Sequence, residues 1–425
     1  MPNSQSRSAG GLAPSAPLLG GLLLAAIALR PQLAVIGALA VPIRDGLGVS
    51  HAFVGLLTAI PVLCMGLFAP LAPGIGGRLG AGRAIVVVAL VIAAAGVLRG
   101  LAGVAVPILA MTVIIGIATA LAGPLQAMLV RSRMANHVVA GTSAYAAGTT
   151  AGAALTAALA VPLAGLLGGW QAALVAVSVL SVAGVPVFVF ALRNARRDAR
   201  RDPAAAGPAV AAVQPARRPG LRALPIRRPA VWGLGLLFGL QSCLYYGTAA
   251  WLPSAYVERG WDAGSAAMLI SLSNIIGFVA ILAVPVLARW GVGRRELLAA
   301  SAFASITGLL GVVLVPEPGY LWALILGAGL GMMFTLVQTL PSDVGRDAHE
   351  TGGAAALMLL AGYLVAAGAP FALGAVRDAT GSFGEGLWAL VAIAVAMLPL
   401  TWVLAPQRLR LRSSVAARDT EGQAG

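Results

Sequence analysis

Charged residues are scarce in this chain. Only 10% of its 425 residues are Asp, Glu, Lys or Arg, whereas 59% are hydrophobic. A soluble globular domain carries far more charge, so the composition excludes that class and indicates a protein that crosses a membrane several times. Lysine is absent, and all 28 basic residues are therefore arginine.

Acidic residues and cysteines are also few. None of the 14 acidic residues lies inside a long apolar run, so the spans offer no carboxylate that could carry a proton. Cys64 and Cys243 lie in apolar runs and lack the spacing of a disulfide or a metal site. The histidines map to loops, which disfavours a proton relay; they are His51, His137 and His349. No catalytic constellation shares a candidate site, so we expect no enzyme, no metal and no cofactor.

The basic residues are unevenly distributed. A net charge of +14 would favour nucleic-acid binding in a soluble protein, but here most arginines occupy alternate loops between the apolar runs. Cytoplasmic loops of membrane proteins are enriched in basic residues in this way. The pattern argues against a nucleic-acid partner and predicts that both termini lie in the cytoplasm.

Long apolar runs fill most of the sequence. A span needs about 20 apolar residues, and it must be helical because lipid offers the backbone no hydrogen-bond partners. The predicted fold class is therefore an all-α polytopic membrane protein with 12 transmembrane helices. The predicted spans are 17–42, 52–73, 84–104, 106–130, 138–163, 170–192, 230–252, 264–287, 297–316, 319–341, 352–373 and 386–405.

A segment rich in Arg, Ala and Pro separates the first six spans from the last six. We interpret it as a solvated cytoplasmic linker, with contact to anionic lipid headgroups as the alternative. The predicted organisation is an N-terminal tail at 1–16, a six-helix bundle at 17–192, the linker at 193–229, a second six-helix bundle at 230–405 and a C-terminal tail at 406–425.

An internal repeat supports this division. Arg78 to Arg83 and Arg289 to Arg294 both have the pattern R-x-G-x-G-R, 211 positions apart, and each is expected to form a short loop. Neither fits a phosphate-binding loop. Parallel halves related by an axis along the membrane normal are typical of one large transporter architecture.

One arginine, Arg30, interrupts the first apolar run near its middle. A charge at mid-membrane costs roughly 2.5–3.5 kcal/mol on insertion scales, so such a residue is a functional candidate. The next residue, Pro31, has no N–H and predicts a break in the helix. With no acidic residue in any span, the guanidinium indicates a site for an anion, which it can grip through paired hydrogen bonds. The alternative is a structural arginine that bonds helix-end carbonyls.

Neutral polar residues complete the predicted site. The repeat offset pairs Arg30 with Gln241, which shares a helix face with Tyr245 four residues later. Tyr246 adds a second phenol, and hydrogen bonding between helices is the alternative role for all three. Further candidates for the cavity, each with a structural alternative, are Gln126, Tyr145, Gln338 and Tyr363.

Two residues near the outer ends of spans receive a structural prediction instead. Arg99 is expected to extend its side chain to water, with attraction of anions as the alternative. Trp251 is expected in the aromatic belt at the membrane surface.

Several motifs resemble those of one transporter family. They are Leu29-Arg30-Pro31 in the first span, Gln241-Ser242-Cys243-Leu244-Tyr245-Tyr246 and Trp251-Leu252-Pro253 in the seventh, and Gly362-Tyr363-Leu364-Val365-Ala366-Ala367-Gly368 in the eleventh. Together they resemble the major facilitator superfamily, and within it the cyanate permease/nitroimidazole transporter (CynX/NimT) family. The resemblance covers both halves of the chain.

The resemblance implies alternating access, in which two bundles rock about a central site. It implies a secondary active transporter of a small organic or pseudohalide anion in a bacterial inner membrane, working as a monomer and surrounded by membrane lipid. Efflux of drug-like heterocycles such as nitroimidazoles and a passive anion pathway remain alternatives. The loop arginines Arg78, Arg83, Arg289 and Arg294 are the expected gating residues.

Overall fold

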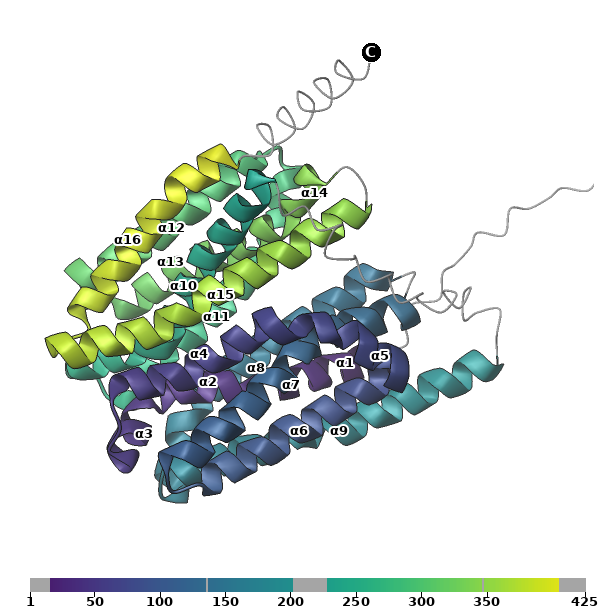
Figure 1. Cartoon of the computed structure of the whole chain (residues 1–425), viewed down its shortest axis with the longest axis horizontal. Coiled ribbons are helices and arrows are strands. Elements are labelled where there is room, and N and C mark those ends of the chain that lie inside the picture. Colours follow the sequence, from purple (N-terminus) through teal and green to yellow (C-terminus); the bar gives the residue numbers. More distant parts are fainter. Residues whose placement is uncertain (1–15, 135–136, 202–227, 346–347, 405–425) are drawn as a thin grey trace, which may run out of the picture.

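The structure is a computed structural model that describes residues 16–134, 137–201, 228–345 and 348–404, and the described chain is helical without strands (Figure 1). The predicted C-terminal tail, all but the last residue of the predicted N-terminal tail, and residues 202–227 of the predicted linker lie outside the described residues.

The described residues of the first half form nine α-helices and one short 3-10 helix. These are α1 (Ala16–Leu29), α2 (Pro31–Ala38), α3 (Ala40–Leu47), α4 (His51–Phe68), η1 (Ala69–Leu71), α5 (Ala72–Leu79), α6 (Ala81–Leu101), α7 (Ala105–Arg133), α8 (Val138–Leu167) and α9 (Trp170–Arg201). The last of them, α9, continues nine residues past the predicted end of its span at 192.

The second half is built in the same way. Its helices are α10 (Pro229–Glu258), α11 (Ala263–Arg289), α12 (Arg294–Leu314), α13 (Gly319–Thr339), α14 (Pro341–Val344), α15 (Ala348–Thr380) and α16 (Gly384–Val403). In Figure 1 the two halves lie one above the other, with the ends of α9 and α10 that flank residues 202–227 on the right. We call this end the linker side and the opposite end the far side.

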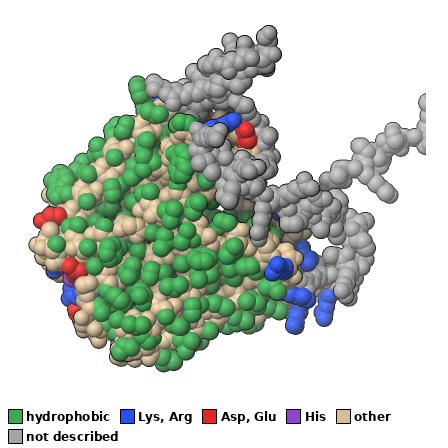
Figure 2. Space-filling model, viewed as in Figure 1, with side chains coloured by type: hydrophobic (Ala, Val, Ile, Leu, Met, Phe, Trp, Pro, Cys, Tyr) green, Lys and Arg blue, Asp and Glu red, His purple; other side chains and the backbone are tan. Residues whose placement is uncertain are grey.

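Eleven helical segments of the described chain are long and apolar enough to cross a membrane. The twelfth predicted span, 230–252, lies within α10, a 30-residue helix that is not among these eleven. Figure 2 shows hydrophobic side chains over the flanks of the helices and charged ones gathered toward two ends. The chain is thus a polytopic membrane protein, while the count of twelve spans and the orientation of the termini stay predictions.

The first span is broken where the sequence predicts it. Helix α1 ends at Leu29, Arg30 takes φ −102° and ψ −18°, and α2 starts at Pro31. Proline has no N–H to continue the hydrogen-bond ladder but suits the first position of a new helix. The break sets Arg30 at a junction between two helices, where its own carbonyl accepts from the N–H of Leu33 at 3.2 Å.

The repeat R-x-G-x-G-R forms a turn in both halves. Gly80 and Gly291, which are 211 positions apart, have φ of +78° and +89°. This left-handed region favours glycine, since a Cβ would be strained there. The prediction of two short loops at equivalent places is confirmed.

Three helix pairs make the most extensive contacts between the halves in the described residues: α4 with α15, α8 with α11, and α2 with α10. The first pair is close because Gly55 of α4 faces backbone, and a Cβ there would come 2.3 Å from the carbonyl oxygen of Pro370 in α15. In the second pair, the hydroxyl of Ser271 donates to the carbonyl of Ala154 at 2.9 Å. Small residues at helix crossings let backbones approach in this way.

Candidate functional site

The guanidinium of Arg30 faces a group of phenols from the other half of the chain. It interacts electrostatically with Tyr246, Tyr245 and Tyr363, and it hydrogen-bonds the side chain of Tyr246. Among the described residues no ion pair involves Arg30. A half-buried cation is therefore surrounded by neutral oxygens.

The tyrosines are held by α10 and α15. The rings of Tyr245 and Tyr246 meet edge to face at a centroid distance of 5.1 Å, and Tyr363 meets Phe238 of α10 in the same manner at 5.1 Å. Such pairs fix ring orientation, because the positive ring edge faces the negative ring face. The hydroxyl of Tyr246 also donates to the sulfur of Met65 on α4 at 3.6 Å, which places this contact between the two halves.

The surroundings of these polar groups are apolar. Val62, Cys243, Ala366 and Ala367 form a small buried cluster on which Tyr245 and Tyr363 pack. Both of these tyrosines, like Arg30, keep part of their surface exposed. A charged hydrogen bond is stronger in such surroundings than in water.

Gln241 does not join this group by a hydrogen bond. Its side chain is 2% exposed, its amide donates to the carbonyl of Leu330 on α13 at 3.4 Å, and its oxygen accepts from the hydroxyl of Ser242 at 3.2 Å. In this conformation Gln241 links α10 to α13 inside the second half. The side-chain oxygen of Asn274 on α11 instead accepts from the Tyr245 hydroxyl at 3.0 Å.

The other residues predicted for the cavity are not among those that interact with Arg30. Gln126 is buried in α7, and its amide nitrogen has no hydrogen-bond partner. Tyr145 of α8 packs on the core of the first half near Arg131, and Gln338 is exposed on α13. Their part in binding stays a prediction.

The expected gating arginines occupy different environments. Arg78, Arg83 and Arg289 are exposed on the linker side. Arg294 is paired: it lies 2.8 Å from the carboxylate of Asp343 in α14 and donates to the hydroxyl of Thr339 at 2.6 Å. These bonds join α12 to α14 and to the end of α13 within the second half, so they do not connect the halves.

A bond between the halves is found on the far side instead. Asp378 of α15 accepts from the backbone N–H groups of His51 and Ala52 at 3.0 and 2.8 Å, and its oxygen lies 2.7 Å from Nδ1 of His51. A carboxylate of the second half thus caps the N-terminus of α4 in the first half. Helix N-termini favour negative charge because their first N–H groups lack partners.

The tautomer of His51 follows from its neighbours. Arg44 approaches Nε2 of His51 at 2.6 Å, and a guanidinium can only donate. Nε2 therefore accepts, and the ring proton sits on Nδ1, from which it is donated to Asp378. Sequence reasoning placed His51 in a loop; it is the first residue of α4.

Replacing Asp378 with alanine is expected to open the far side. Each charge-assisted hydrogen bond contributes about 1.5–3 kcal/mol, so losing the cap should raise the far-side-open population at least about tenfold. Electron-spin distance measurement between labels at Pro42→Cys and Glu385→Cys, with Cys64 and Cys243 changed to alanine, would detect the longer distance.

The matched control is Asp262→Ala. Asp262 caps α11 of its own half by accepting from the N–H of Ser265 at 2.9 Å. This variant also loses a carboxylate cap on the far side, but it loses no bond between the halves. The distance between its spin labels should therefore equal that of the parent. Unchanged distances in Asp378→Ala as well would show that the cap does not hold the far side closed.

Two structural predictions are wrong. Trp251 is not at the membrane surface: it is 3% exposed and donates to the carbonyl of Pro370 on α15 at 2.7 Å. Arg99 does not reach water, because its side chain is 0% exposed. In both cases a neighbouring helix supplies the hydrogen-bond partner that we had expected water or headgroups to supply.

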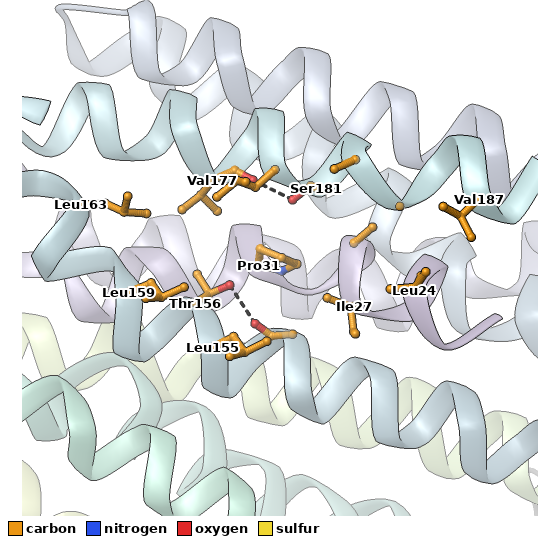
Figure 3. Close-up of a pocket in the computed structure, with 15 residues that line it drawn as sticks. Leu24, Ile27, Pro31, Leu155, Thr156, Leu159, Leu163, Val177, Ser181 and Val187 are labelled. Carbon is orange, nitrogen blue, oxygen red and sulfur yellow. Dashed lines mark hydrogen bonds between the residues drawn. The ribbon is translucent and has the colours of Figure 1, made fainter. Parts of the chain in front are cut away.

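An apolar pocket of about 350 Å³ lies beside the break in the first span, among α1, α2, α8 and α9 (Figure 3). Its two labelled hydroxyls are already used: Thr156 donates to the carbonyl of Gly152 at 2.7 Å and Ser181 to that of Val177 at 2.8 Å. Arg30 is not among its lining residues. The pocket therefore offers an anion no charged partner.

Comparisons with known sequences agree with this architecture. Residues 20–370 match the sequence profile of the Major Facilitator Superfamily. The chain is 27% identical to the 2-nitroimidazole transporter of Escherichia coli strain K12, over 90% of this chain and 92% of that protein. It is 26% identical to the cyanate transport protein CynX of the same organism, over 91% and 97%. An uncharacterised Bacillus subtilis transporter, YycB, is 28% identical over 89% and 91%.

Solved structures share the fold at lower identity. The xylose transporter XylE of E. coli, in a partially occluded inward-open conformation, matches with a TM-score of 0.71 at 13% identity, over 92% of this chain and 99% of that one. A bacterial homologue of the lysosomal transporter Spinster matches with a TM-score of 0.70 at 16% identity, over 93% and 97%. The named relatives are transporters, in agreement with the sequence-based argument against an enzyme.

Proposed function

Because the chain belongs to the Major Facilitator Superfamily, we propose that it carries a small organic or pseudohalide anion, such as cyanate or a small carboxylate, across the bacterial inner membrane by alternating access. The observation that carries the proposal is Arg30, a cation at a helix break that has phenols around it and no carboxylate paired with it in the described chain.

The chemistry of the group favours a compact anion. Arg30 supplies the charge, and the hydroxyls of Tyr245, Tyr246 and Tyr363 each have one proton to donate to an acceptor atom of the ligand. For Tyr245 and Tyr246 this bond would replace the present bonds to Asn274 and Met65. A guanidinium presents a planar fork that matches a carboxylate through two bonds. Similarity to a cyanate transport protein adds cyanate as a candidate of the same size class.

A second candidate is export of nitroheterocycles, favoured by similarity to the 2-nitroimidazole transporter. A nitro group is a neutral acceptor pair that Arg30 could also bind, while the aromatic rings of the tyrosines could stack on a heterocycle. A passive anion pathway is the third possibility. The closed contacts between α4 and α15 argue for rocking halves instead.

The energy source follows from what the spans lack. All acidic residues lie outside the predicted spans, so a buried carboxylate is not the proton carrier. We propose that the anion moves with its own proton as a weak acid, in exchange for another anion, or alone.

A thermal-unfolding screen of the purified full chain tests the ligand class. Cyanate, formate, acetate and 2-nitroimidazole are added in turn, and a ligand at 100 times its Kd should stabilise the folded state by about 2.7 kcal/mol. We expect the small anions to raise Tm, and cyanate uptake into proteoliposomes, with and without a pH gradient, to saturate.

Other outcomes select the alternatives. A rise in Tm with 2-nitroimidazole alone would support export of heterocycles. Anion flux that increases linearly with concentration would support a passive pathway. Neither result is compatible with the proposed anion carrier.

A further inference from the structure

The most deeply buried charge in the described chain is Arg99, near the far-side end of α6. Its side chain is 0% exposed, and its Nη2 donates to Gln32 twice, to the side-chain oxygen at 2.6 Å and to the backbone oxygen at 3.2 Å. Its Nε and Nη1 have no hydrogen-bond partner. A buried cation with unsatisfied N–H groups destabilises the folded state. Its presence therefore suggests a functional role.

The hydrogen bonds of Arg99 begin a directed chain. The amide of Gln32 donates to the hydroxyl of Ser178 on α9 at 2.8 Å, and that hydroxyl donates to the carbonyl of Leu174 at 2.6 Å. Each group accepts one bond and donates the next, an order in which neighbouring bonds strengthen one another. This series of hydrogen bonds connects α6 and α9 to α2.

Close packing leaves these groups no freedom to move. A Cβ on Gly96 of α6 would lie 2.4 Å from the hydroxyl of Ser178 and 2.8 Å from the amide nitrogen of Gln32. Only glycine leaves room for the side chains of Gln32 and Ser178 where these helices cross. Gln32 and Ser178 are themselves 1% and 0% exposed.

The anchored helix is the one that follows Arg30. Gln32 is the second residue of α2, two positions after Arg30, and α2 is only eight residues long. The break at Pro31 interrupts the backbone ladder, so α1 cannot by itself set the direction in which α2 starts. Arg99 bonds both the backbone and the side chain of Gln32, which fixes α2 within one turn of the break.

We propose that Arg99 is a positioning residue: through Gln32 it holds the start of α2 and thereby aims Arg30 at the tyrosines of the second half. The inference rests on the proposed function of Arg30 as the anion-binding residue. Arg99 itself does not contact the ligand; it acts through Gln32 and the backbone of the break.

The test compares Arg99→Met, Arg99→Lys and Gly96→Ala in the full chain. Replacing a buried charge with an apolar side chain of similar length is often neutral for stability. We therefore expect Arg99→Met to keep its Tm but to raise the KM for cyanate about tenfold, the scale on which remote residues alter coupling. Arg99→Lys can still donate to Gln32 and should restore most of the affinity.

Gly96→Ala displaces Gln32 and Ser178 without changing any charge and should raise KM in the same way. Its matched control is Gly123→Ala in α7, where a Cβ meets nothing within 4 Å, and this variant should behave as the parent. If Arg99→Met does not fold, Gly96→Ala and Arg99→Lys decide the question.

Hydrogen–deuterium exchange gives a readout that needs no ligand. Peptides covering 31–38 should exchange faster in Arg99→Met and Gly96→Ala, while peptides of α4 stay protected. Unchanged exchange there, or an unchanged KM with a lowered Tm, would overturn the positioning role. Faster exchange in a chain whose parent shows no saturable cyanate uptake would count against the proposed function and leave the anchoring of α2 in place.

Discussion

Replacing Arg30 with glutamine should abolish saturable uptake of small anions while leaving the fold in place. Glutamine can still hydrogen-bond Tyr246, but it has no charge to offset the cost of taking an anion out of water. Losing one partner of a buried charged pair costs about 2–5 kcal/mol, which corresponds to a loss of affinity between about thirtyfold and a few thousandfold. Uptake into proteoliposomes measures the loss of transport, and the ligand-induced shift in Tm of the protein in detergent measures the loss of affinity.

Two further variants control this experiment. Arg30→Lys keeps the charge without the planar fork and should retain weak binding. Arg295→Gln removes an exposed arginine that stacks on Trp402 at the linker side and should not change KM. Full anion uptake by Arg30→Gln, or export of 2-nitroimidazole that does not depend on residue 30, would rule out the anion site.

Enlarging Gly55 should stop the transport cycle altogether. The Cβ of a larger residue would lie 2.3 Å from the carbonyl oxygen and 2.8 Å from the carbonyl carbon of Pro370. Both atoms belong to backbone, so no side-chain rotation relieves the clash. In Gly55→Leu we expect the far side to stay open and uptake to fall at least about a hundredfold, which requires a penalty of about 2.7 kcal/mol.

The same spin-label pair used for Asp378 reports the geometry of Gly55→Leu. Gly368→Leu is the matched control, since Gly368 lies on α15 two residues before Pro370 and a Cβ there meets nothing within 4 Å. It should transport normally. Normal transport by Gly55→Leu would mean that α4 and α15 need not approach as closely as they do here.

Sequence reasoning identified the features that depend on local chemistry. Hydropathy alone located the helices, because lipid leaves a backbone no other choice. The dipeptide Arg30-Pro31 predicted a break and a functional cation at one point, and the structure has the break there. It also brings Tyr245, Tyr246 and Tyr363 to the guanidinium.

Features that depend on which helices touch were not predictable. Helical spacing placed Gln241 and Tyr245 on one face. It could not predict that the amide of Gln241 would hydrogen-bond a carbonyl of α13. Asp378 and His51 are 327 positions apart, and nothing local to either indicates their pairing. For Arg99 and Trp251, distance from the end of a span predicted contact with water, whereas the packing of a neighbouring helix decided the outcome.

The candidate site is divided between the halves, since Arg30 belongs to the first and its three phenols to the second. If Arg30 binds an anion as proposed, neither half has a complete set of partners for it, and the bound anion would bridge the two halves. The ligand then lowers the energy of the arrangements in which the halves are close. The empty and the loaded carrier would therefore differ in how easily the halves move relative to each other. That difference determines whether the protein exchanges one ligand for another or transports it in one direction alone.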